Sequence, residues 1–538
     1  MALLRQILAP GVRRAPFIST AAALGALALA SLPRQSAAAA DDHDSATAAR
    51  SGATVHDATT QTSTPSADPQ ALKRELEREE ARIRALEQRL FQDQAALEKE
   101  PPLQPSTPTA PSGATAAGGT VSGPNALLGS FGPDGFVLRS AGGQNVIRLR
   151  GNLSLDYRYF HDSYDPATAD TFLVRKARPV LEGTLDGIFD FRLMPDFAQG
   201  KTVLQDAWVD ARFSNWFIPQ IGKFKAPVGL ERLQLEQFAR FIEASLTADL
   251  LPYRDLGFAV NGNIGRGLFT YQVGVFDGAP DGGGTDANSV PDANSTGKFT
   301  WGARIFSRPF ADSGWSALKR LGFGIAGTYV NVSGIETATS TVSLLAAYKT
   351  TGQQPLFSFR GNTATGFNNA TIAQGIERRL VPQLNYYVGP FGVLGEYVKE
   401  DQQVFRQLSP TTSRNGTLDN HAWEVQSYVF LTGENETYEQ LVVPKRSVGQ
   451  GGFGAWEIAA RYHELHFDSA AFAGGANSFA NPATAVESAR AVGAAINWYL
   501  TQNFKIQLDY EVTRFEGGAP AGNRPDERVL TSQFALIF

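Results

Sequence analysis

The stretch Ile147–Phe160, with the sequence IRLRGNLSLDYRYF, carries the clearest pattern in the chain and decides its fold. Apolar and aromatic residues alternate there with polar ones. Because side chains alternate between the two faces of a β-strand, the segment predicts a strand with one apolar face and one charged face. The apolar face holds Ile147, Leu149, Leu153, Leu155, Tyr157 and Tyr159, and the polar face holds Arg148, Arg150, Asn152, Ser154, Asp156 and Arg158.

The same alternation recurs along residues 125–538. Clear examples are residues 189–193, 206–213, 456–462, 492–500 and 505–512. A soluble β-sandwich also alternates, with its apolar face turned inward. The number of repeats, the aromatic residues at the ends of the runs and the unequal loops are typical of a transmembrane barrel instead. Residues 125–538 have room for sixteen strands of about ten residues, with eighteen as the alternative, so we expect an all-β, antiparallel, transmembrane β-barrel domain.

Composition excludes several classes of function. The 538 residues contain no cysteine, which excludes a disulfide framework, thiolate zinc sites, iron–sulfur ligation and cysteine catalysis. The formal net charge of −5 argues against a nucleic-acid partner bound through a basic field. After the first forty positions, no apolar run reaches the roughly 18 residues that a membrane-spanning helix needs.

Four segments precede the predicted barrel. Residues 1–40 join a basic start, an apolar stretch and small residues, which predicts a secretory signal peptide rather than a transit peptide. Residues 41–69 are polar and without a period, as in a disordered linker. Residues 70–100 repeat Leu or Ile every seven positions and predict a coiled-coil helix, with a single solvated amphipathic helix as the alternative. Residues 101–124 form a Pro-rich linker.

The chain ends with the sequence LTSQFALIF, residues Leu530–Phe538, whose last residue is aromatic. This ending resembles the terminal strand of bacterial outer-membrane proteins, which the outer-membrane assembly machinery reads. The resemblance implies a barrel surrounded by outer-membrane lipid. The helix predicted at 70–100 would then lie in the periplasm.

Several further segments, in order along the chain, resemble the phosphate-selective porin O and P family. They are Arg175–Arg178 (RKAR), Gln220–Glu231 (QIGKFKAPVGLE), Arg240–Leu246, Gly389–Phe391 with Gly395–Tyr397, Tyr428–Glu434, Gly454–Tyr462 and Asn497–Leu500. The resemblance spans nearly all of residues 125–538. It implies a sixteen-stranded, homotrimeric outer-membrane porin that passes small anions, with phosphate and polyphosphate as candidate solutes.

A pore selects by the charges at its narrowest ring and on its wall. The resemblance implies basic lumen residues and an inward-folded third loop. We assign that loop to residues 231–256, between strands near 218–226 and 257–263. Arginine suits phosphate because its guanidinium presents paired donors. The candidate pore-lining and anion-binding residues are Arg148, Arg150, Arg158, Arg175, Lys176, Arg192, Asp210, Arg212, Lys225, Arg240 and Arg254.

Some expectations limit this assignment. Arg175 and Lys176 are adjacent, so only one of them should face the lumen of a regular strand. We expect Arg192, Asp210 and Arg212 on the wall near the third loop. Any single arginine also has a simpler interpretation, a wall charge that balances a carboxylate. Residues 125–538 hold 36 Lys and Arg against 40 Asp and Glu, so a general, non-selective porin stays open.

Other classes of function are weaker. A structural anchor that tethers the envelope through its coiled coil is the main alternative. An enzyme is not expected, because His463 and His466 are three residues apart and should lie on opposite faces of their strand. No cofactor and no metal site is expected. The loop with Asp277, Asp281, Asp286 and Asp292 has carboxylates for calcium, but its Gly and Asn content is that of an ordinary mobile loop.

Overall fold

The computed structural model describes residues 127–132, 135–161, 169–200, 202–265, 267–278, 297–337 and 341–538. The predicted signal peptide, both linkers and the coiled-coil helix lie outside the described residues. So does most of the acidic loop, including Asp281, Asp286 and Asp292. Within the described ranges, no helix combines the length and apolar character needed to cross a membrane.

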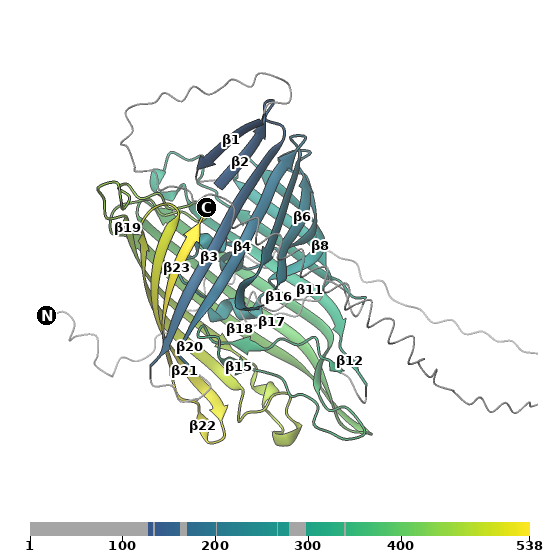
Figure 1. Ribbon diagram of the computed structural model, residues 1–538. Coiled ribbons are helices and arrows are strands. Elements are labelled where there is room, and N and C mark those ends of the chain that lie inside the picture. The colour runs from purple at the N-terminus through teal and green to yellow at the C-terminus, as the bar shows by residue number, and fades with distance from the viewer. Residues whose placement is uncertain are drawn as a thin grey trace, which may run out of the picture. The chain divides into compact units, whose positions relative to one another are not determined.

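Sixteen strands of the described residues form one closed antiparallel barrel, as predicted. In chain order they are β3 (Val146–Phe160), β4 (Thr171–Leu185), β5 (Phe189–Asp196), β6 (Val203–Ala211), β7 (Ile218–Lys225), β8 (Arg254–Ile264), β9 (Phe269–Phe276), β10 (Thr300–Ser307), β11 (Leu321–Ser333), β16 (Thr371–Val388), β17 (Phe391–Ser409), β18 (Thr412–Phe430), β19 (Ala455–His466), β20 (Val486–Tyr499), β21 (Phe504–Ala519) and β23 (Glu527–Ile537). Each strand pairs with the next, and β23 pairs with β3 to close the sheet (Figure 1). Closure leaves no unpaired strand edge in lipid.

Several short strands and helical turns lie outside the sixteen barrel strands. A hairpin of β1 (Leu127–Gly132) and β2 (Gly135–Ser140) extends the sheet from the start of β3, at the end where the C-terminus lies (Figure 1). The remaining short strands are β12 (Ile335–Glu336), β13 (Thr341–Val342), β14 (Tyr348–Lys349), β15 (Pro355–Phe357) and β22 (Gly522–Asn523). The helical turns are α2 (Leu230–Leu233), η1 (Ala198–Gly200), η2 (Glu236–Phe238), η3 (Leu246–Leu250), η4 (Ser316–Leu318), η5 (Ser469–Ala471) and η6 (Gly475–Asn477).

Exposure on β3 distinguishes the barrel from a soluble sandwich. Leu149 is 45% exposed and Leu155 is 42% exposed, whereas Asp156 and Arg158 on the opposite face are 2% and 6% exposed. The apolar face therefore points out of the barrel and the charged face points into it. This is the arrangement that lipid outside and a polar lumen require.

Loops fill one part of the barrel interior. An apolar cluster joins Leu246, Leu250 and Leu251 of the β7–β8 connection to Tyr348 and Phe357 of the β11–β16 connection. The cluster also contains inward residues of the long strands, Val381, Val398, Leu418 and Leu465. Its burial holds the β7–β8 connection inside the barrel.

Candidate functional site

The third loop, residues 226–253 between β7 and β8, crosses the barrel interior. The backbone N–H of Leu246 donates to His463 Nδ1 at 3.0 Å, and the backbone N–H of Ile242 donates to Asp509 Oδ2 at 2.6 Å. Arg379 Nε donates to the Leu250 carbonyl at 2.6 Å. Strand β8 begins at Arg254, so the loop ends three residues earlier than predicted. His463 is buried and His466 is partly exposed, which agrees with their assignment to opposite faces.

The expectation that only one of Arg175 and Lys176 faces the lumen is wrong. The β3–β4 register pairs Ser154 with Lys176 but Leu155 with Val174, so Arg175 is an extra residue in a β-bulge. A bulge lets consecutive side chains point to the same face. Arg175 is 3% exposed and Lys176 is 6% exposed, and both side chains reach carboxylates of the third loop.

Glu243 of the third loop joins two wall strands. Its Oε1 lies 2.5 Å from Arg158 Nη2 of β3, and its carboxylate accepts two hydrogen bonds from Arg175 of β4, at 2.7 and 2.9 Å. Burial disfavours the Glu243 charge, but Arg175 and Arg158 outweigh it and hold the pKa below the ordinary value. Arg158 and Arg175 therefore anchor the loop against the wall.

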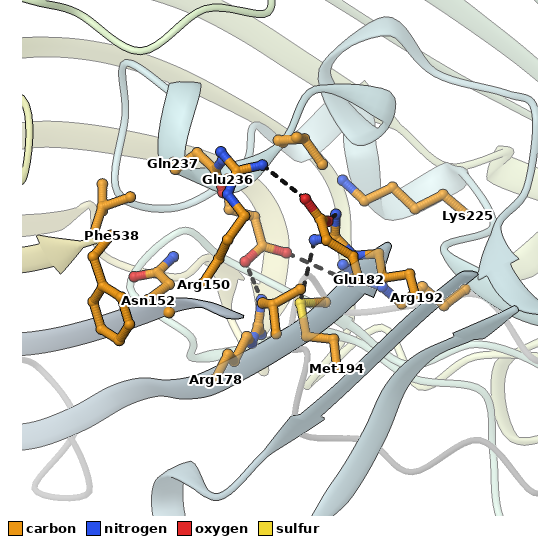
Figure 2. A pocket seen from close by; sticks show the side chains of 15 residues that line it. Arg150, Asn152, Arg178, Glu182, Arg192, Met194, Lys225, Glu236, Gln237 and Phe538 are labelled. Atoms are coloured by element: carbon orange, nitrogen blue, oxygen red, sulfur yellow. Dashed lines mark hydrogen bonds and ion pairs between the residues drawn. The ribbon is translucent and has the colours of Figure 1, made fainter. Parts of the chain in front are cut away.

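A pocket, called the basic pocket below, lies between the third loop and the wall strands β3, β4, β5, β7 and β8 (Figure 2). Its charged lining residues are Arg150, Arg178, Arg192, Lys225 and Arg254, against the carboxylates Glu182 and Glu236. Behind this lining, Asp196 pairs with Arg178, and Asp206 pairs with Arg192 and Arg254, so five cations stand against four carboxylates. The small excess of fixed positive charge that remains favours anions in a lumen.

Glu182 and Glu236 each form ion pairs with more than one of these cations. Glu182 receives Arg150 Nη1 on Oε1 and Arg192 Nη1 on Oε2, each at 3.0 Å (Figure 2). Glu236 pairs with Arg178, with Lys176 at 3.4 Å and with Arg254 at 3.5 Å. Burial opposes the Glu236 charge, but Arg178 and the other cations hold its pKa well below the ordinary value.

Three predicted residues lie apart from the basic pocket. Arg240 is 3% exposed, and its guanidinium lies 2.7 Å from both Glu436 and Glu457, so it balances carboxylates rather than facing open lumen. Arg212 is half-exposed near the β4–β5 turn, where it pairs with Asp190 at 2.6 Å. Asp210 of β6 pairs in the sheet with Asp190 of β5, close to the same turn. The expectation that Asp210 and Arg212 lie near the third loop is therefore wrong.

The other predicted residues are in or beside the basic pocket. Lys225 lines it and donates to the Gln234 carbonyl at 2.7 Å. Arg254 pairs with Asp206 at 2.7 Å, and Arg192 pairs with the same carboxylate at 3.1 Å. Arg148 occupies an inward-facing position of β3 and forms no ion pair with any residue that the structure describes.

Two residues of the basic pocket, Arg178 and Glu182, were not among the predicted site residues. Both lie an even number of residues from Lys176 on β4 and so face inward as it does, and alternation along β4 could have identified them. The 431–454 turn, between β18 and β19, gave no such signal. It begins at the opposite end of the barrel from the third loop, yet Tyr438 OH donates to the Leu230 carbonyl and Gln234 Nε2 donates to the Tyr438 carbonyl at 3.1 Å. The third loop is therefore held from both ends of the barrel.

One family model matches most of the barrel. A model of the family described as phosphate-selective porin O and P matches residues 147–536. No curated protein matches the chain.

Among solved structures, the chain is similar to OmpT, an outer membrane protein of Vibrio cholerae, with a TM-score of 0.45 and 9% identity over 73% of this chain and 98% of that one. It is also similar to the outer membrane channel DcaP of Acinetobacter baumannii, with a TM-score of 0.45 and 10% identity over 74% of this chain and 99% of that one. OprB of Pseudomonas putida has a TM-score of 0.44 and 10% identity over 73% of this chain and 94% of that one.

Proposed function

The chain belongs to the phosphate-selective porin O and P family, and from this we propose that its channel passes small anions, phosphate among them, through the basic pocket. Family membership and the closed barrel indicate an outer-membrane porin. The observation that carries the proposal is the basic pocket, where five basic residues gather beside the third loop and outnumber the four carboxylates that line the pocket or pair with them.

The arrangement of the cations supports anion transfer rather than permanent capture. Arg150 and Arg192 share Glu182, Arg178 and Arg254 share Glu236, and Arg192 and Arg254 also share Asp206. A cation that shares a carboxylate keeps donors for a passing anion. A lumen site also has to bind weakly enough for its solute to leave.

Phosphate specificity is tested by adding phosphate to a chloride current through the purified protein in a planar bilayer. We expect micromolar phosphate to reduce the chloride current, because phosphate competes for the paired guanidinium donors. Chloride current that phosphate leaves unchanged would instead support a non-selective porin. The balance of 36 basic and 40 acidic residues in 125–538 is the observation that favours this second candidate. Folded, heat-modifiable protein that gives silent bilayers would reject a channel and support the tether.

We further propose that the protein is a homotrimer and that residues 70–100 form its periplasmic coiled coil. The heptad spacing of Leu76, Ile83, Leu90 and Leu97 supports this proposal. Deleting residues 70–100 should lower the temperature at which the trimer dissociates in native electrophoresis. An equally stable trimer would show that the segment serves another purpose, such as attachment to the cell wall.

We also propose that the assembly machinery recognises the C-terminal strand through Phe538. Removal of Phe538 should reduce the amount of folded barrel in the outer membrane. An unchanged amount would reject that role.

A further inference from the structure

Three glutamates converge inside the barrel, away from the basic pocket. Glu231 comes from α2 of the third loop, Glu396 from β17 and Glu424 from β18. One carboxylate oxygen from each lies within 4.8 Å of the other two. Glu396 is 5% exposed and Glu424 is 1% exposed, so water screens this group of charges poorly.

Hydrogen bonds fix two of the three carboxylates from behind. Glu396 accepts the backbone N–H groups of Leu230 and Glu231, at 2.6 and 3.3 Å. Glu231 accepts Ser245 N and Oγ, at 2.9 and 2.8 Å, and Gln426 Nε2 at 2.7 Å. These donors orient the oxygens without supplying a full positive charge.

Glu424 differs from the other two. Its Oε2 accepts Gln426 Nε2 at 2.6 Å, but its buried Oε1 has no hydrogen-bond partner. Among the residues that the structure describes, no Lys, Arg or His forms an ion pair with Glu231, Glu396 or Glu424. Two buried carboxylates beside a partly buried third, none of them in a direct ion pair, carry a desolvation cost that a proton or a cation would relieve.

We propose that Glu231, Glu396 and Glu424 bind one divalent cation of the calcium class. All three ligands are carboxylate oxygens, which hard cations prefer, and their spacing suits the oxygen shell of calcium. The free Oε1 of Glu424 supplies the ligand that the protein leaves unused. The cation joins the start of the third loop to β17 and β18, a structural role that is independent of which solute the channel passes.

Terbium luminescence of the full-length protein tests the site. Protein stripped with EGTA in detergent should bind one Tb³⁺ per chain in a saturable manner, and Ca²⁺ should displace it. Glu424→Gln should weaken this binding by more than roughly tenfold, because affinity for such cations follows the number of ligand charges. Glu516→Gln is the matched control, because Glu516 is exposed and lies outside the group. It should bind as the wild type does.

Two results would overturn the proposal. One is the absence of a saturable, Ca²⁺-displaceable site in the stripped wild-type protein, since shared protons would then neutralise the carboxylates. The other is equal Tb³⁺ affinity in Glu424→Gln and the wild type, which would place the cation elsewhere. If Glu424→Gln does not fold, the wild-type titration and the Glu516→Gln control still decide whether a saturable site exists. The same titration on the folded variant Glu231→Gln then locates it.

Discussion

Arg175 donates two hydrogen bonds to Glu243, from Nε to Oε1 at 2.7 Å and from Nη2 to Oε2 at 2.9 Å. The pair joins wall strand β4 to the third loop, 68 residues apart in the sequence. It exists because the bulge at Arg175 turns that side chain inward beside Lys176. The position of the third loop therefore depends on an irregularity in one wall strand.

Glu243→Gln should loosen the third loop. The substitution removes the charge shared by Arg158 and Arg175 and leaves two buried cations poorly paired, at a cost of about 3–5 kcal/mol. We expect a larger and noisier single-channel conductance than in the wild type. Glu516→Gln, which changes an exposed carboxylate, should conduct as the wild type does.

The same pair has a defined pH dependence. The pKa of Glu243 is lowered in the folded protein, so its stabilising effect is present above the ordinary value and is lost as the pH falls through the lower folded-state value. Wild-type conductance should therefore become noisy only in acid, whereas Glu243→Gln should be noisy throughout. Quiet Glu243→Gln channels at neutral pH would contradict the anchoring role.

Ionisation of Glu436 should destabilise the 431–454 turn in alkali. Burial and the neighbouring Glu457 raise the pKa of Glu436 to about 8, despite the attraction of Arg240. A raised carboxyl pKa gives stability that is present at low pH and lost as the pH rises through about 8. The ionised Glu436 is then a buried charge that Glu457 repels, despite the attraction of Arg240.

We therefore expect wild-type conductance to rise above that pH as the 431–454 turn releases the third loop. Glu436→Gln should remove this step, and Glu439→Gln, at an exposed position of the same turn, should retain it. A step that persists in Glu436→Gln would assign the titration to another group.

Gly151→Ala should impair closure of the barrel. A Cβ at Gly151 would lie 2.5 Å from the Phe538 ring, at the point where β3 meets the C-terminal residue. Overpacking of this kind costs about 1–3 kcal/mol. The temperature of the heat-modifiability transition should fall. At Gly142 an added Cβ meets nothing within 4 Å, so Gly142→Ala is the control. Equal transitions in both variants would contradict the packing argument.

Alternation in the sequence was enough to predict the barrel, because lipid outside and a polar lumen impose opposite demands on neighbouring residues. It also placed Arg148, Arg150 and Arg158 on the inward face of β3. Alternation gave the wrong prediction at Arg175, because a β-bulge adds one residue to β4 there. The position of a bulge depends on how β4 pairs with β3, and the sequence of β4 alone does not show that pairing. The sequence could not show that Arg254 lines the basic pocket whereas Arg240 does not. The partners of Arg240 lie far away in the sequence, on the 431–454 turn and on β19.

The central claim is that anions cross the barrel through the basic pocket, and the reversal potential in a KCl gradient tests it most directly. The wild type should show anion preference, and the double variant Arg150→Gln/Arg192→Gln should lose most of it. Arg212→Gln, at the rim, should keep the wild-type value. A wild-type channel that prefers cations, or one whose preference survives the double substitution unchanged, would contradict the claim.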